Sequence, residues 1–370
     1  KAVESGLVED LQDSAIFIEG IGRDKVSDAT TNIIRRNLIE YTKNQCKLWD
    51  IPLTLNVPSG FFWDQNSKKW SQYYVERLII GNKQILLVPK IAVTFYRDYI
   101  DQQYYQHYVL NFLQEEHIQK RSFLVKLRKA KKGQPPQPYV TKKDIKEKDT
   151  PFSKEILRDF TRKHPDIFNS FKVNKKESID PIKNESISNV NIKEVVKYLI
   201  DKLKNTPAGG IDAQAYHKLM IGILELIFYP NLVNPIKERE INEGRKRIDI
   251  VFDNSALKGF FYQLHKAKEI LSRYIFVECK NYSNDPKNPE LDQLSGRMGV
   301  NTSKFGLLVC RKVDDEQLML KRCSDLWKQK NELIIVLSDI EIIKMLSALL
   351  EKNGDPETIL LNKQKEIILS

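Results

Sequence analysis

The chain of 370 residues contains few cysteines and no long apolar run. Its cysteines form no CxxC pair and have no histidine at zinc-site spacing, which argues against a disulfide framework and a structural zinc. We therefore expect a reducing compartment, with the cytoplasm as the default. No segment approaches the roughly 20 apolar residues of a membrane helix, so we expect no membrane span. The four cysteines are Cys46, Cys279, Cys310 and Cys323.

Signals for export, for nucleotide binding and for a histidine metal site are also missing. The opening residues have no signal-peptide core, and we expect residues ahead of Lys1 because the chain does not begin with Met. Gly20 and Gly22 lack the GxxxxGK[ST] spacing, which excludes a P-loop site. None of the five histidines forms a metal-spaced pair, and we expect His217 on a helix surface.

Positive charge is abundant, with 60 Lys and Arg against 49 Asp and Glu and a net charge of +11. This balance fits a polyanionic partner, with nucleic acid as the first candidate, and equally a basic surface without such a partner. The length favours two domains, and 41% hydrophobic residues can build their cores. We place the domains at 1–185 and 186–370.

The first region is predicted to be α+β, with a helix over 27–49 and a strand over 84–89. An aromatic stripe near residue 108 fits a packed core face better than a base-stacking surface. Pro and Gly are expected to break regular structure in the basic segment 120–148, where Lys129, Lys131 and Lys132 are candidate phosphate contacts, against a solvated charged surface. The polar stretch 172–188 is the candidate linker.

The second region alternates helices and strands, which predicts an α/β fold with helices flanking a mixed sheet. The expected helices are 191–204, 212–228, 289–299, 314–330 and a final one at 339–350, with a helical insertion at 256–272. The expected strands are 247–252, 274–280, 305–310 and 332–337.

Two of these apolar strands carry charged residues. Glu278 and Lys280 share one face of their strand, and Asp249 lies among apolar neighbours on the strand before. Buried charges cost several kcal/mol unless they are paired or bound to a metal. Asp249 and Glu278, with the backbone carbonyl of Cys279, are therefore candidate ligands for Mg²⁺ or Mn²⁺. The non-catalytic alternative is a structural Glu278–Lys280 ion pair on a half-exposed strand.

Three further residues fit around this centre. Glu225 interrupts an apolar helix and is expected to face the metal rather than the core. Gln293 and Arg297 lie four residues apart on the helix after Lys280, where Gln293 could position the scissile phosphate or the water and Arg297 a phosphate.

This pattern resembles the PD-(D/E)XK nuclease superfamily. The stretches 277–282 (VECKNY) and 292–297 (DQLSGR) are similar to restriction-endonuclease-like proteins of the Mrr-like kind. The resemblance covers about residues 210–345 and none of 1–185. Asp249 and Glu278 are 29 residues apart, wider than a simple hairpin, which we attribute to the insertion, with Asp253 as the alternative acid.

The resemblance implies a restriction-endonuclease-like fold and a magnesium-dependent endonuclease that cuts DNA in preference to RNA, in restriction or antiviral defence. Asp249, Glu278, Lys280, Glu225 and Gln293 would be catalytic. Residues 1–185 would bind DNA, a regulator or a partner chain, and the protein is a possible homo-oligomer. The alternatives are a silent nucleic-acid-binding or scaffolding subunit and a nuclease activated by an ATPase or sensor partner.

Overall fold

The protein combines helices with a large mixed sheet and smaller sheets, as the α/β prediction requires. The computed structural model describes residues 7–93, 100–128, 136–176, 182, 184, 191–241, 246–266 and 270–370. The chain forms two compact units. Unit 1 consists of Lys1–Cys46 with Pro52–Asp180, and unit 2 of Lys47–Ile51 with Pro181–Ser370. Among the residues just given, no helix is both long and apolar enough to cross a membrane.

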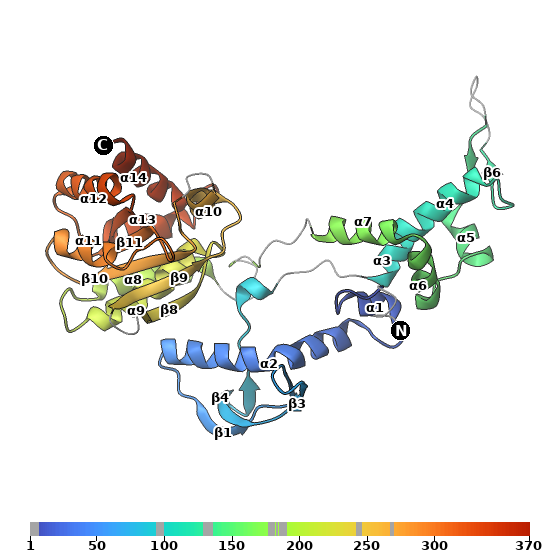
Figure 1. Ribbon diagram of the computed structural model, residues 1–370, viewed down its shortest axis with the longest axis horizontal. Coiled ribbons are helices and arrows are strands. Elements are labelled where there is room, and N and C mark those ends of the chain that lie inside the picture. Colours follow the sequence, from blue (N-terminus) through green and yellow to red (C-terminus); the bar gives the residue numbers. More distant parts are fainter. Residues whose placement is uncertain are drawn as a thin grey trace. The chain divides into compact units, whose positions relative to one another are not determined.

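Unit 1 is helical except for short strands (Figure 1). A three-stranded sheet has the order β1-β4-β5, and two separate hairpins pair β2 with β3 and β6 with β7. The helical elements are α1 (Asp13–Phe17), α2 (Arg23–Leu48), η1 (Lys90–Ala92), α3 (Asp101–Tyr104), η2 (Tyr105–Val109), α4 (Leu110–Gln119), α5 (Lys142–Lys148), α6 (Lys154–Lys163) and α7 (Pro165–Lys176). The strands are β1 (Thr54–Pro58), β2 (Phe62–Asp64), β3 (Lys69–Ser71), β4 (Tyr74–Ile80), β5 (Lys83–Ile85), β6 (Lys126–Leu127) and β7 (Pro138–Tyr139).

The aromatic stripe of η2 and α4 belongs to the core. Tyr105, Val109 and Leu113 are at most 8% exposed and cluster with Phe168 and Phe171 of α7. Helical spacing of large apolar residues therefore predicted a packed face correctly, and these rings do not form an open stacking surface.

Regular structure in the basic segment is a correction to the sequence prediction. The expectation that Pro and Gly break every element of 120–148 is wrong, because β6, β7 and α5 form there. Thr141 caps α5 by accepting a hydrogen bond from the Asp144 amide, which stabilises the helix start. The first part of the candidate linker is also helical, since α7 extends to Lys176.

Unit 2 is built on a five-stranded sheet of order β12-β11-β10-β9-β8. The strands β8, β9 and β10 are antiparallel neighbours, whereas β10, β11 and β12 run parallel. All residues of β11 and β12 are buried, as expected of parallel strands covered on both faces. The strands are β8 (Leu232–Ile241), β9 (Lys246–Asn254), β10 (Tyr274–Lys280), β11 (Phe305–Cys310) and β12 (Leu333–Ser338).

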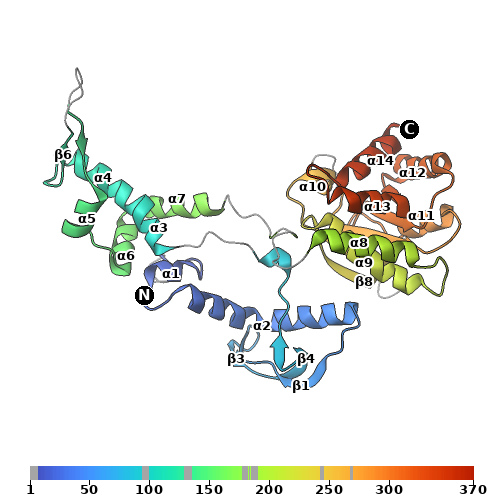
Figure 2. The ribbon, with the colours of Figure 1, turned by 180° about the vertical axis from the view of Figure 1, so that it is seen from behind.

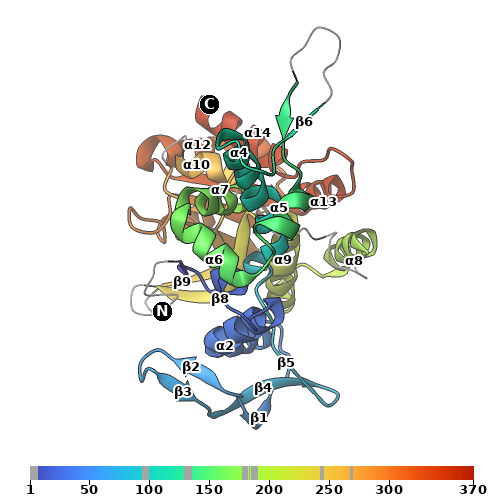
Figure 3. The same ribbon diagram turned by 90° about the vertical axis from the view of Figure 1, so that its right-hand side faces the viewer.

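Helices cover this sheet on both sides. α8, α9 and α13 pack on one another and lie together at the front in Figure 2, whereas α12 packs against α11 and α14. Figure 3 shows α8 and α13 on one side of unit 2 and α10 and α12 on the other. The helices are α8 (Ile192–Asn205), α9 (Ala213–Phe228), α10 (Gly259–Lys266), α11 (Asn288–Ser295), α12 (Glu316–Lys330), α13 (Asp339–Ala348) and α14 (Glu357–Leu369).

Three features of unit 2 depart from the sequence prediction. β8 was not expected, and neither was α14, so the helix over 339–350 is not the last one. α11 ends at Ser295, four residues before the expected limit, and Arg297 therefore lies in the turn that follows.

Candidate active site

The candidate site lies at the carboxyl end of β10. In the antiparallel pair of β9 and β10, Val277 is opposite Ile250. The regular pairing ends there, and the same register continued by one residue would set Asp249 opposite Glu278. Directly opposed residues of an antiparallel pair point to the same face. On that register the two predicted acids share one face, and both interact with Arg297, which binds Glu278 and interacts electrostatically with Asp249.

Glu278 is a buried carboxylate held between two cations. It is 1% exposed, and Lys280 Nζ lies 2.9 Å from its Oε1. Arg297 donates a hydrogen bond from Nη1 to the other oxygen, Oε2. The predicted alternative of a pair on a half-exposed strand is wrong about exposure, because β10 is buried from Ile275 to Lys280. Because both charges must lose their hydration, such a buried pair adds little net stability. Stability alone therefore does not explain why the pair is buried.

Lys280 also contacts α11. Its Nζ donates a hydrogen bond of 3.0 Å to Gln293 Oε1 and lies 5.9 Å from the centre of the Tyr282 ring. The ammonium therefore bridges the Glu278 carboxylate and the Gln293 amide. Three predicted site residues are thereby joined by one ion pair and one hydrogen bond.

Asp249 meets β10 through the backbone. Its Oδ2 accepts a hydrogen bond of 3.0 Å from the Cys279 amide. Burial raises the pKa of the Cys279 thiol well above its usual value, and the charge of Asp249 adds to this. Cys279 can thus take part through its backbone carbonyl, while its thiol stays protonated.

His217 belongs to this site, which corrects the predicted helix-surface position. Its Nε2 lies 3.1 Å from the Cys279 carbonyl oxygen and 4.0 Å from Asp249 Oδ2, and its side chain is 18% exposed. The sequence had a signal for burial only, because Ile221 and Leu224 follow His217 at helical spacing and are both buried. The imidazole therefore sits beside the two oxygens proposed as metal ligands.

Arg297 contacts protein rather than solvent. Burial lowers the pKa of its guanidinium, while the charge of Asp249 acts in the opposite direction. Asp249, Glu278, Lys280 and Arg297 together carry two negative and two positive charges. The formal charges of these side chains thus cancel one another. Arg297 occupies Glu278 Oε2, an oxygen that could otherwise bind a metal.

Three oxygen donors of the site suit a divalent cation. Asp249, Glu278 and the Cys279 carbonyl offer the hard oxygens that Mg²⁺ and Mn²⁺ prefer. In the parts of the chain that the structure describes, no three His, Cys, Asp or Glu side chains group as a metal site. Two carboxylates with one carbonyl remain, and water would complete the coordination. These residues fit the cation provided that Arg297 leaves Glu278 Oε2.

The contacts described above do not include the four other predicted site residues. Glu225 lies on α9, eight residues beyond His217, which is a rise of about 12 Å along the helix. Its part in the centre stays a prediction. The candidate phosphate contacts fall outside the described residues; they are Lys129, Lys131 and Lys132.

A second charged group borders the site. Tyr216, the residue before His217, donates a hydrogen bond of 2.9 Å to Asp339 Oδ1. Arg311 Nε lies 3.1 Å from Asp339 Oδ2 and its guanidinium stacks on the Tyr216 ring at 5.1 Å. Burial raises the pKa of Asp339 to about 6, against the opposing effects of Arg311 and Tyr216.

Comparison with known proteins finds a family match for only the first part of the chain. Residues 1–101 match a family model described as Domain of unknown function (DUF8370). No curated protein and no solved structure matches the chain. The function must therefore be argued from the site itself.

Proposed function

We propose that unit 2 is a metal-dependent endonuclease of the PD-(D/E)XK type that hydrolyses DNA phosphodiester bonds. The observation that carries this proposal is the buried Glu278–Lys280 pair at the end of β10, one register step from the last pair with β9. Its burial costs free energy that a structural surface pair would not, and a reaction centre accounts for that cost.

Asp249, Glu278 and the Cys279 carbonyl would hold the cation, Mg²⁺ or Mn²⁺. When bound, the cation supplies Lewis-acid stabilisation of the phosphate and lowers the pKa of a bound water. Lys280 orients the attacking water or stabilises the developing charge, and Gln293 fixes the ammonium through its 3.0 Å hydrogen bond. His217 orients the Cys279 carbonyl through its 3.1 Å contact with the carbonyl oxygen.

The preference for DNA and the place in restriction or antiviral defence rest on the resemblance of the motif. A cytoplasmic location rests on the four free thiols, which are all buried and act as small apolar side chains. These parts of the proposal are separate from the chemistry of the site.

A nicking assay on supercoiled plasmid with Mg²⁺ or Mn²⁺ tests the activity. The wild type is expected to cut, and Glu278→Ala and Lys280→Ala are expected to lose at least about 100-fold in rate. Lys304→Ala is the matched control, because this partly exposed lysine precedes β11, at the other end of the strands from Glu278, and its ammonium donates to the Lys330 carbonyl of α12. Equal cutting by wild type, Glu278→Ala and Lys280→Ala would remove the assignment.

A second candidate, a nuclease that stays silent until it is activated, is favoured by one observation. Arg297 binds Glu278 Oε2, so a metal ligand is covered by a cation of the protein itself. Arg297→Ala would then cut without a partner under conditions in which the wild type is inactive. Wild-type activity equal to that of Arg297→Ala would exclude this form of the proposal.

A further inference from the structure

Positive charge is concentrated in one segment of unit 1. Residues 120–148 contain eleven Lys and Arg against two Asp and Glu, whereas the rest of the chain has 49 against 47. The structure describes eight of these cations, here called the basic surface. They are Lys120, Arg121, Lys126, Arg128, Lys142, Lys143, Lys146 and Lys148.

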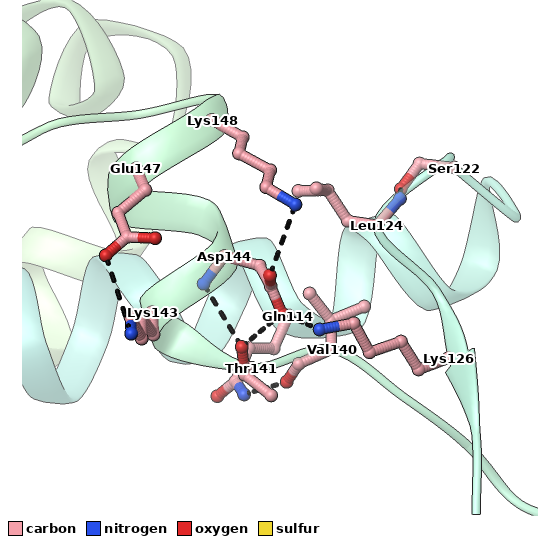
Figure 4. Close-up of polar contacts among 10 residues, drawn as sticks. All are labelled: Gln114, Ser122, Leu124, Lys126, Val140, Thr141, Lys143, Asp144, Glu147 and Lys148. Carbon is pink, nitrogen blue, oxygen red and sulfur yellow. Dashed lines mark hydrogen bonds and ion pairs between the residues drawn. The ribbon is translucent and has the colours of Figure 1, made fainter.

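One buried carboxylate joins the elements of the basic surface (Figure 4). Asp144 accepts a hydrogen bond of 2.6 Å from Lys126 Nζ of β6 and another from the Thr141 hydroxyl, and its Oδ1 lies 3.6 Å from Lys148 Nζ. The hydrogen bonds from Lys126 and Thr141 lower the pKa of Asp144 to about 2. The carboxylate is therefore charged at every physiological pH and fixes β6 against α5.

The outer cations project from this frame. The side chain of Lys143 is 80% exposed, and that of Lys120 is 67% exposed. Arg128 covers the Tyr139 ring at 5.1 Å, which holds the guanidinium on the hairpin face. Nearby carboxylates lower the positive charge, because Glu147 lies 3.9 Å from Lys143 and Glu116 2.5 Å from Lys120. They do not cancel it, because the cations outnumber them.

A large apolar side chain stands out among these cations. Phe123 is 79% exposed and lies in the turn between α4 and β6. The Val125 amide donates to the Ser122 carbonyl at 3.1 Å, and the Ser122 hydroxyl lies 2.9 Å from His117 Nδ1. The turn is thus hydrogen-bonded at both ends, and it holds the phenyl ring in solvent where it buries nothing.

We propose that the basic surface and Phe123 form a binding site for double-stranded DNA, in which the cations contact phosphates and the phenyl ring contacts the bases. The choice of DNA rests on the proposed function of unit 2. Clustered Lys and Arg release condensed counterions from a duplex, and apolar side chains such as Phe can wedge between its base steps.

Two other occupants fit less well. Single-stranded nucleic acid is bound on rows of aromatic rings, whereas in the described part of 120–148 Phe123 is the one strongly exposed aromatic side chain. Insertion of a helix into a membrane surface needs a continuous apolar helix face. α4 and α5 instead bury their apolar residues, among them Leu110, Leu113 and Ile145.

The test is a fluorescence anisotropy titration of the full chain with a labelled 20-base-pair duplex in EDTA, between about 50 and 200 mM salt. The triple variant K120A/R128A/K143A is expected to bind at least about 10-fold more weakly, and its slope of log K against log salt should be shallower by about 2.7. The control K69A/K83A/K163A removes three exposed lysines elsewhere in unit 1 and should match the wild type.

The phenyl ring is tested separately. Phe123→Ala should weaken duplex binding by about 10-fold with an unchanged salt slope, and Phe123→Trp should retain it. Phe61→Ala, which removes another exposed ring (64%) of unit 1, is the control. Equal binding by both triple variants, tighter binding of single-stranded DNA, or binding to anionic vesicles without duplex binding would overturn the proposal.

EDTA prevents cleavage in these titrations, so they measure duplex binding independently of catalysis. Duplex binding that depends on the basic surface, without any plasmid cutting, would support this inference and contradict the proposed nuclease. Plasmid cutting by the wild type, together with a duplex affinity that K120A/R128A/K143A leaves unchanged, would support the nuclease and contradict this inference.

Discussion

Replacing Arg297 with Ala would leave one oxygen of a buried carboxylate without its cation. Glu278 is 1% exposed, and the side chain of Arg297 is 10% exposed, so water screens their attraction little. Removing one partner of a buried ion pair costs about 3–5 kcal/mol. Lys280 remains 2.9 Å from the other oxygen, so we expect the low end, about 3 kcal/mol at pH 7 in EDTA.

Urea unfolding of wild type and Arg297→Ala in EDTA measures this cost. Arg247→Ala is the control, because its side chain is 60% exposed and pairs with Glu238 at 3.6 Å, a pair that should contribute at most about 1 kcal/mol. Mn²⁺ should then stabilise Arg297→Ala more than the wild type, since the freed Glu278 oxygen becomes available to the cation. A loss below about 0.5 kcal/mol, or equal stabilisation by Mn²⁺, would refute the reasoning.

Three further predictions concern the surroundings of the site. His217→Ala should lower the cleavage rate by about 10- to 100-fold, because the imidazole contacts the Cys279 carbonyl, while His265→Ala should match the wild type in the plasmid assay. Gly306→Ala should cost about 1–3 kcal/mol in thermal unfolding, since its Cβ would meet Met298 Cε at 2.6 Å and lie 3.2 Å from the backbone oxygen of Phe276, whereas Gly22→Ala, with open space around it, should not destabilise comparably. Asp339 holds its proton to about pH 6 in the folded protein against an ordinary pKa of 3.8, so this group destabilises the fold increasingly as pH rises between these values. The stability of the wild type relative to Asp339→Asn should therefore fall across that range and stay level above it, and urea unfolding at a series of pH values checks the sign.

The apolar strands and helices of unit 2 were predictable because their sequence patterns are continuous. β10 and β11 have the predicted limits, and α8 and α9 begin within a residue of theirs; the Asn191 side chain caps α8. β8 escaped prediction for a physical reason. Pro235 interrupts it, its register shifts between Val233 and Ile236, and edge strands tolerate both.

The acids and the lysine of the candidate site were predictable from charge on apolar strands, but their partners were not. The pairing of Arg297 with Glu278 depends on α11 ending at Ser295 and on the turn that follows, which helical spacing did not indicate. Assigning His217 to the site depends on the packing of α9, which brings the imidazole to the Cys279 carbonyl. Tertiary contacts of this kind arise from sheet register and helix packing, which periodicity alone does not determine.

Anomalous diffraction from crystals soaked in Mn²⁺ tests the central claim most directly. A peak within coordination distance of Asp249, Glu278 and the Cys279 carbonyl, with Arg297 withdrawn from Glu278, is the result that the proposed nuclease predicts. No peak at a saturating concentration, with the Glu278–Arg297 pair intact, would contradict it.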